Sequence, residues 1–319
     1  MNRSIVWLAA GASVAALAAG CSSSTKTTSP TSLAVPSATS ATSSAPASSS
    51  TSTAARGSGP VDVLYAGSLV NMMQTQVDSG FKSATGYTVN GIAAGSDALA
   101  AQIKGKVRQA DVFISAAPTV NNTLEGSTNG NWVSWYATFA RSPLVLGYNP
   151  SSRFANDIKT KPWYQVIAEP GILVGRTDPA TDPKGKLTAN ALKAAAQTYN
   201  EPALATIAAS TANVFPEETL VGRLQAGQLD AGFFYSSETT AASIPEVPVT
   251  LPGQKLQATY TITVVNNAPD AAGAEAFVAY LLGPQGQAIL EKDGFQLVQP
   301  PTATGTGVPA GLQGVIPSA

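Results

Sequence analysis

Short apolar segments alternate with segments of helical periodicity over much of this chain, and this alternation constrains its fold more than any other feature. Residues 61–65, 87–92 and 111–115 have the length and apolar character of strands. Residues 69–81 and the segment around Leu99 and Ile103 place their apolar side chains at helical spacing. Because strands that alternate with helices are joined by right-handed crossovers, the pattern predicts an α/β layer with parallel strands.

The same alternation continues to residue 291 and is long enough for two α/β lobes. The predicted strands are 171–175, 229–235 and 258–265, and the predicted helices are 187–199, 219–225, 271–282 and 284–291. Residues 135–148 are predicted to form two extended stretches broken near Ser142 and Pro143, and the tail from Pro300 is predicted to be irregular. We expect lobe 1 to comprise residues 57–143 and 258–319, and lobe 2 to comprise residues 144–257.

The N-terminal 21 residues are predicted to be a lipoprotein signal peptide. Arg3 provides a positive charge, an apolar stretch of about 15 residues follows, and Ala18-Ala19-Gly20-Cys21 resembles a lipobox. We therefore expect export, followed by lipid anchoring through Cys21 to the outer face of the cytoplasmic membrane.

Residues 22–56 have a different composition from the rest of the chain. Of these 35 residues, 31 are Ser, Thr, Ala or Pro. Such a segment cannot bury enough apolar surface to offset the entropy lost on ordering, so it is predicted to be a disordered stalk.

The composition excludes several classes of site. The 319 residues include no His and a single Cys, which rules out a Ser-His-Asp triad, a His-ligated zinc site and an intrachain disulfide. All 19 acidic residues but only 15 of the 18 basic ones follow Arg56, which gives residues 57–319 a net charge of −4. A nucleic-acid partner is therefore not expected.

Two turns with the same Ala-Gly-Ser sequence follow the first two predicted strands. Ser68 and Ser96 stand where a helix N-cap is expected, and helix N-termini attract small anions. Each serine alone is explained by capping its own helix. Two such turns at the same ends of neighbouring strands favour a shared anion site in one crevice.

Six segments, in chain order, resemble those of the molybdate/tungstate-binding proteins of ABC transporters. They are residues 65–69 (YAGSL), 94–96 (AGS), 110–116 (ADVFISA), 144–149 (LVLGYN), 175–185 (GRTDPATDPKG) and 224–235 (LQAGQLDAGFFY). The resemblance implies a periplasmic-binding-protein-like (type II) clamshell, each lobe a mixed, mostly parallel sheet flanked by helices. It further implies ligand binding by Ser68, Ser96, Asp182, Glu217 and Tyr235.

The two implied carboxylates need an explanation, because one placed about 4 Å from a unit negative charge costs roughly 4 kcal/mol at an effective dielectric constant near 20. Either the carboxyl group is protonated, or its oxygen bonds the molybdenum or tungsten centre, which sulfur in sulfate does not permit. Asp182 as a turn or cap residue and Glu217 as a first-turn residue remain simple structural alternatives. Glu218 is an alternative to Glu217, and Lys184-Gly185-Lys186 stands where the tungstate branch usually has Cys-Gly-Tyr.

We therefore expect a monomeric, non-enzymatic solute-binding protein that delivers molybdate or tungstate to a membrane permease and needs no cofactor. The same fold with another oxyanion, such as sulfate, is the first alternative. A secreted hydrolase using Ser68 and a cell-wall module are alternatives of other classes.

Overall fold

The computed structural model describes residues 57–317, which belong to one compact unit. The predicted signal peptide, Cys21 and the stalk lie outside the described residues. Within residues 57–317, no helix combines the length and apolar character needed to cross a bilayer.

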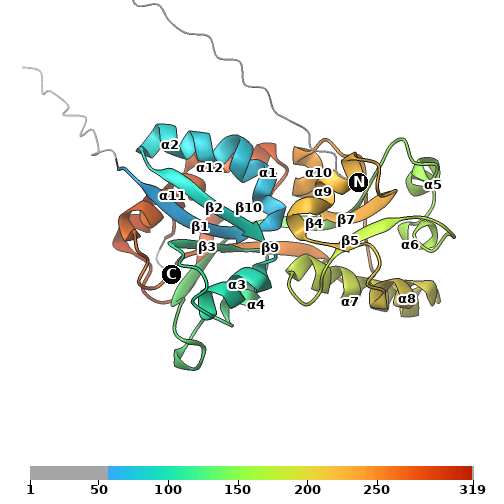
Figure 1. Ribbon diagram of the computed structural model, residues 1–319, viewed down its shortest axis with the longest axis horizontal. Helices are drawn as coiled ribbons and strands as arrows, with labels where there is room; N and C mark the ends of the chain where they lie inside the picture. The colour runs from blue at the N-terminus through green and yellow to red at the C-terminus, as the bar shows by residue number, and fades with distance from the viewer. Residues whose placement is uncertain (1–56, 318–319) are drawn as a thin grey trace, which may run out of the picture. The chain divides into compact units, whose positions relative to one another are not determined.

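Lobe 1 of the structure contains the first half of the long strand β4 and the strands on that side of the sheet (Figure 1). Its strands are β1 (Pro60–Ala66), β2 (Thr88–Ala94), β3 (Val112–Ser115), β4 (Trp135–Tyr148), β9 (Gln257–Val264) and β10 (Gln296–Gly305). β1 lies between β2 and β3 and is parallel to both, whereas β9 pairs antiparallel with β3 and β4, and β10 pairs antiparallel with β4.

Helices cover both faces of the lobe 1 sheet (Figure 1). They are α1 (Val70–Met72), α2 (Asp78–Thr85), α11 (Ala271–Leu282) and α12 (Pro284–Lys292) on one side, and α3 (Ser96–Lys104) and α4 (Pro118–Asn121) on the other. Successive strand residues point to opposite faces, so Val63 and Tyr65 join one apolar cluster while Leu64 joins the other.

Lobe 2 is built on the second half of β4. Its strands are β5 (Val174–Thr177), β6 (Val214–Phe215), β7 (Ala231–Tyr235) and β8 (Glu246–Pro248). Its helices are α5 (Ala155–Thr160), α6 (Trp163–Val166), α7 (Pro183–Thr198), α8 (Ala203–Ala209), α9 (Glu217–Gln225) and α10 (Ser236–Ala241). β5 is parallel to β6 and β7, and β4 is antiparallel to β7 and β8.

β4 is one continuous strand of 14 residues, so the predicted break near Ser142 and Pro143 is wrong. Pro143 pairs with Gln257 of β9, and the next residue, Leu144, pairs with Tyr235 of β7. The proline therefore lies where β4 changes partners, a position at which a missing N–H is tolerated. The lobe boundaries stated above stay a prediction.

Two other segments differ from the sequence-based predictions. The tail is irregular only after Gly305, and not from Pro300 as predicted, because β10 runs to Gly305 and pairs with β4. α7 begins at Pro183, four residues before the predicted start, because Asp182 caps it and proline fits the first helical turn.

The apolar cluster around Phe81 yields a prediction about stability. Phe81 is fully buried and packs edge-on against Phe277, with ring centroids 5.2 Å apart. We expect Phe81→Ala to lower the free energy of unfolding by about 3–5 kcal/mol, because it leaves a cavity. Urea unfolding of the full chain tests this, with Val107→Ala as the control, since Val107 is 72% exposed and should change the value by less than about 0.5 kcal/mol. Equal effects of the two substitutions would contradict the described core.

Candidate functional site

The two Ala-Gly-Ser turns of lobe 1 follow β1 and β2 as predicted, but their serines do not occupy the predicted N-cap positions. Ser68 lies inside a 3-10 turn, Gly67–Leu69, and Ser96 is the first residue of α3, whose N-cap is Gly95. Neither serine caps its helix, so that prediction is wrong. The hydroxyl of Ser68 accepts a hydrogen bond from Tyr260 Oη at 2.9 Å, and the hydroxyl of Ser96 accepts one from the backbone N–H of Ala116 at 3.1 Å.

Two carboxylates of lobe 2 lie at helix starts. Asp182 caps α7, where its Oδ1 accepts a hydrogen bond from the backbone N–H of Lys184 at 3.1 Å. Glu217 is the first residue of α9, and its side chain is fully buried, whereas the neighbouring Glu218 is exposed. The carboxylate that faces the interior is therefore that of Glu217.

Each turn of lobe 1 faces one of these carboxylates across the space between the lobes. A Cβ placed on Gly67 would lie 3.0 Å from Oε2 of Glu217. A Cβ placed on Gly95 would lie 2.3 Å from the backbone oxygen of Thr181 and 3.0 Å from Cβ of Asp182. Glycine at both turns therefore permits the two lobes to approach this closely.

Two polar contacts join the lobes beside the Gly95 turn. The backbone N–H of Ala98, in the first turn of α3, donates to the backbone oxygen of Thr181 at 3.1 Å. Lys186 Nζ lies 2.7 Å from Oδ1 of Asp97, and both side chains are partly exposed. The structure therefore shows the lobes in contact at this edge.

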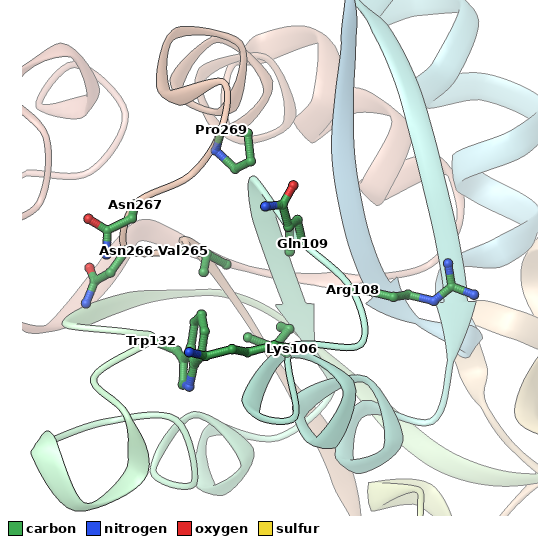
Figure 2. Close-up of a pocket in the computed structure, with 10 residues that line it drawn as sticks. Lys106, Arg108, Gln109, Trp132, Val265, Asn266, Asn267 and Pro269 are labelled. Carbon is green, nitrogen blue, oxygen red and sulfur yellow. The ribbon is translucent and has the colours of Figure 1, made fainter.

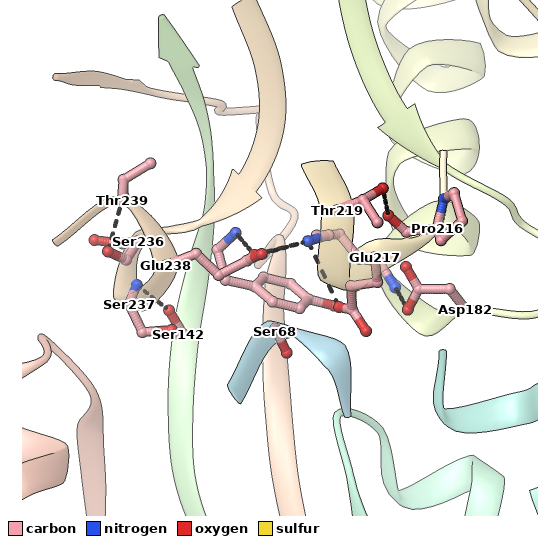
Figure 3. Close-up of polar contacts among 12 residues, drawn as sticks. Ser68, Ser142, Asp182, Pro216, Glu217, Thr219, Ser236, Ser237, Glu238 and Thr239 are labelled. Carbon is pink, nitrogen blue, oxygen red and sulfur yellow. Dashed lines mark hydrogen bonds and ion pairs between the residues drawn. The ribbon is translucent and has the colours of Figure 1, made fainter. Parts of the chain in front are cut away.

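A buried lysine lies among the lobe 2 carboxylates. Lys184 Nζ donates to both carboxylate oxygens of Glu238, at 2.7 and 2.8 Å, and lies 3.5 Å from Oε1 of Glu217. Oε2 of Glu238 also accepts the backbone N–H of Tyr235 at 2.7 Å. Figure 3 shows Ser68, Asp182, Glu217 and Glu238 gathered around this region.

Three carboxylate oxygens in this group are buried and have no hydrogen-bond partner. They are Oδ2 of Asp182 and both oxygens of Glu217. An unpaired buried acceptor costs about 1–3 kcal/mol, and more when it is charged. This arrangement of buried oxygens is therefore costly, as expected where a ligand supplies the missing partners.

The buried groups perturb one another's protonation. Burial, and secondarily the Asp182 carboxylate, raises the pKa of Glu217 well above its ordinary value. Burial also raises the pKa of Asp182, although the ammonium group of Lys184 opposes this effect. Burial alone would lower the pKa of Lys184, but the carboxylates of Glu238, Glu217 and Asp182 raise it, so the side chain stays cationic.

Two buried tyrosines, which lie on strands β7 and β9, pack beside the carboxylates and Lys184. Tyr235 ends β7, and its ring lies edge-on to that of Tyr260 on β9, with centroids 6.0 Å apart. Lys184 Nζ lies 5.5 Å from the centroid of the Tyr235 ring. Burial raises the pKa of both phenols well above the ordinary value, so both remain protonated and able to donate.

Two cavities flank Glu217. One of about 280 Å³ is lined by Gly95, Asp182 and Glu217, among others, and one of about 230 Å³ by Ser68, Glu217 and Glu238, among others. Both are large enough for a small ion.

A third cavity, of about 290 Å³, lies in lobe 1 at the start of β3 (Figure 2). Lys106 and Trp132 line it, with Lys106 Nζ 6.0 Å from the Trp132 ring centroid. Among residues 57–317, no side chain that lines this cavity has a buried polar atom without a partner. The group around Glu217 is therefore the stronger candidate site.

The structure brings Ser68, Asp182, Glu217 and Tyr235 to the same region. Ser96 lies beside Gly95, but its hydroxyl bonds Ala116. Three members of this group were not predicted from the sequence, namely Lys184, Glu238 and Tyr260. The lysine at 184 was visible only as a departure from the tungstate branch, and nothing in the sequence places Glu238 or Tyr260 opposite it.

Comparison with known proteins identifies the family of the chain. The family model described as bacterial extracellular solute-binding protein matches residues 61–296. A putative ABC transporter molybdenum-binding protein of Haloferax volcanii is 30% identical, covering 70% of this chain and 66% of its own. A molybdate/tungstate-binding protein of Thermococcus kodakarensis is 25% identical, covering 66% and 72%.

The fold also has a counterpart among solved structures. The periplasmic molybdate-binding protein of Azotobacter vinelandii aligns over 75% of this chain and all of its own, with a TM-score of 0.60 and 18% identity. This match confirms the predicted two-lobed α/β fold. The sheets are mixed as predicted but not mostly parallel, because β4 pairs antiparallel with each of its neighbours and β9 with β3.

The close approach at Gly95 yields a prediction about lobe contact. We expect Gly95→Ala to push Thr181 away and to speed hydrogen exchange of the Ala98 amide by at least about tenfold, because the added methyl group overlaps a backbone oxygen. Gly222→Ala is the matched control, because its added methyl group meets no atom within 4 Å. An unchanged exchange rate in Gly95→Ala would show that the lobes do not meet there.

Proposed function

Because the chain belongs to the family of bacterial extracellular solute-binding proteins, we propose that it captures molybdate or tungstate for an ABC importer. The observation that carries the proposal is the pair of carboxylates, Asp182 and Glu217, which are buried with unpartnered oxygens and face the two Ala-Gly-Ser turns. The names of the related proteins agree with this choice of solute.

The carboxylate pair suits a metal oxyanion better than sulfate. Molybdenum and tungsten can accept additional oxygen ligands, so the free oxygens of Asp182 and Glu217 would bond the metal centre of the bound anion. The sulfur of sulfate accepts no such ligand, so sulfate would leave the carboxylates unpaired beside a dianion. That arrangement costs several kcal/mol at the dielectric constant of a buried site.

Neutral donors complete the proposed site. Ser68 and Ser96 would contribute hydroxyl or backbone N–H groups from lobe 1, and Tyr235 its phenol from lobe 2. The raised pKa of Tyr235 keeps that phenol a donor. Hydrogen bonds from such donors to an anion are stronger than bonds between neutral groups, and more so in a dry site.

The remaining parts of the proposal concern transport. The closed lobes would present the loaded form to the permease, while a lipid on Cys21 would hold the monomer at the outer face of the cytoplasmic membrane. We propose no enzymatic activity and no cofactor. A nucleophilic serine needs a neighbouring base that accepts its hydroxyl proton. Tyr260 instead donates a hydrogen bond to Ser68 Oγ, which supports a role for Ser68 other than catalysis.

Isothermal titration of the full chain with tungstate, molybdate and sulfate tests the proposed solute. We expect tight binding of the first two and at least about hundredfold weaker binding of sulfate, because sulfate cannot relieve the unpaired carboxylates. Equal affinity for sulfate would favour the sulfate alternative. Absence of binding by all three would favour the hydrolase or the cell-wall module.

The roles of Glu217 and its neighbour yield a paired prediction. We expect Glu217→Ala to weaken tungstate binding by at least about tenfold, because one strong contact to the ligand is lost. The ligand-free protein should lose little stability, because Glu217 makes only a long ion pair of 3.5 Å with Lys184, whose short contacts to Glu238 remain. Glu218→Ala is the control, with a change below about threefold, because Glu218 is exposed. Asp182→Ala should also weaken binding; unchanged affinity in both Asp182→Ala and Glu217→Ala would reject the carboxylate site.

A further inference from the structure

The feature that the proposed function leaves unexplained is a buried ammonium group. Lys184 has no exposed surface, although it lies in the first turn of α7, where a positive charge is unfavourable to the helix dipole. Within residues 57–317, the only other buried basic side chain is Arg176, which bonds the backbone oxygens of Ala208 and Ser210 away from this group. Lys184 is therefore the cation of the candidate site.

The contacts of Lys184 show which carboxylate neutralises its ammonium group. Glu238 takes both short contacts and so balances the ammonium group by itself. The contact to Glu217 is longer, 3.5 Å, and Glu217 has no hydrogen-bond donor of its own. The ammonium group thus lies between a carboxylate that it binds firmly and one that it only approaches.

The charges around Lys184 are unbalanced when all groups are ionised. The carboxylates of Asp182, Glu217 and Glu238 face it from α7, α9 and α10, and the neutral phenols of Tyr235 and Tyr260 face the group from β7 and β9. One cation among three carboxylates leaves two negative charges, to which a dianion would add two more. The ammonium group is the one side chain in this set that attracts the anion by charge.

We propose that Lys184 shifts the selectivity of this site toward doubly charged oxyanions relative to singly charged ones of the same shape, against the repulsion of the surrounding carboxylates. The inference rests on the proposed function and adds the charge class of the ligand to it. An anion that contacts Glu217 lies near the ammonium group, which Glu238 fixes in place. The attraction doubles when the anion carries two charges, whereas hydrogen bonds from serine and tyrosine depend less on total charge.

Tungstate and perrhenate provide the probe, because both are tetrahedral and of similar size and they differ by one unit of charge. Lys184→Met alone would leave Glu238 buried and unpaired, so the informative pair is Glu238→Gln and Lys184→Met/Glu238→Gln. These two proteins differ only at the lysine, and in the second the lysine and one carboxylate are removed together. Lys193→Met, an exposed lysine on the same helix, is the control for loss of charge on α7.

We expect the double variant to bind tungstate at least about tenfold more weakly than Glu238→Gln does. The ratio of tungstate to perrhenate affinity should fall by about 10- to 100-fold, as Coulomb attraction over a few ångströms predicts for one unit of charge. Lys193→Met should change neither value by more than about threefold. A purely structural role for Lys184 would weaken both anions equally and leave the ratio unchanged.

The outcomes separate the inference from the proposed function. If the unmodified chain binds no tungstate, the proposed function fails and the inference fails with it. If the unmodified chain binds tungstate but the double variant matches Glu238→Gln within less than tenfold, only the inference is overturned. If the double variant binds both anions more weakly by the same factor, the role of Lys184 is structural and the inference is overturned as well. Thermal melting of each ligand-free protein shows that the variants are folded.

Discussion

The carboxylate of Glu217 is kept away from water and from hydrogen-bond donors at the contact between the two lobes, and the rest of the site is arranged around that constraint. Gly67 leaves room for it, burial and secondarily Asp182 raise its pKa, and Lys184 approaches it without a short contact. In a protein stabilised only by its core, such a group would be replaced by an apolar one. The buried Glu217 carboxylate is explained by a ligand that contacts its free oxygens.

Most of the secondary structure was predictable because it depends on local periodicity. β1, β2, β3 and β9, and the helices after β1, β2 and β9, lie within a few residues of the predicted ranges, whereas α4 after β3 was not predicted. The continuity of β4 and the extent of β10 were not predictable in this way, since prolines at 143 and 300 are typical of strand ends. β4 tolerates its proline because the partner strand changes there, which is a tertiary fact that no local pattern contains.

The resemblance named several residues of the candidate site, but it did not predict the charged groups around them. Ser68, Asp182, Glu217 and Tyr235 were named from resemblance, and the structure places them in one region. A lysine in a loop-like segment is normally solvated, so the sequence provides no reason to bury Lys184. Its burial follows from the start of α7 at Pro183, which turns the lysine toward α10 and Glu238. The ligand-facing chemistry is therefore set partly by where one helix begins.

The continuity of β4 has a thermodynamic consequence. The two lobes share the hydrogen-bonded backbone of a single strand, with β9 and β10 on its first half and β7 and β8 on its second. Neither lobe can lose its central strand without exposing the core of the other. We therefore expect the two lobes to melt as one cooperative unit. The strand that joins the lobes is thus also the segment on which the stability of both depends.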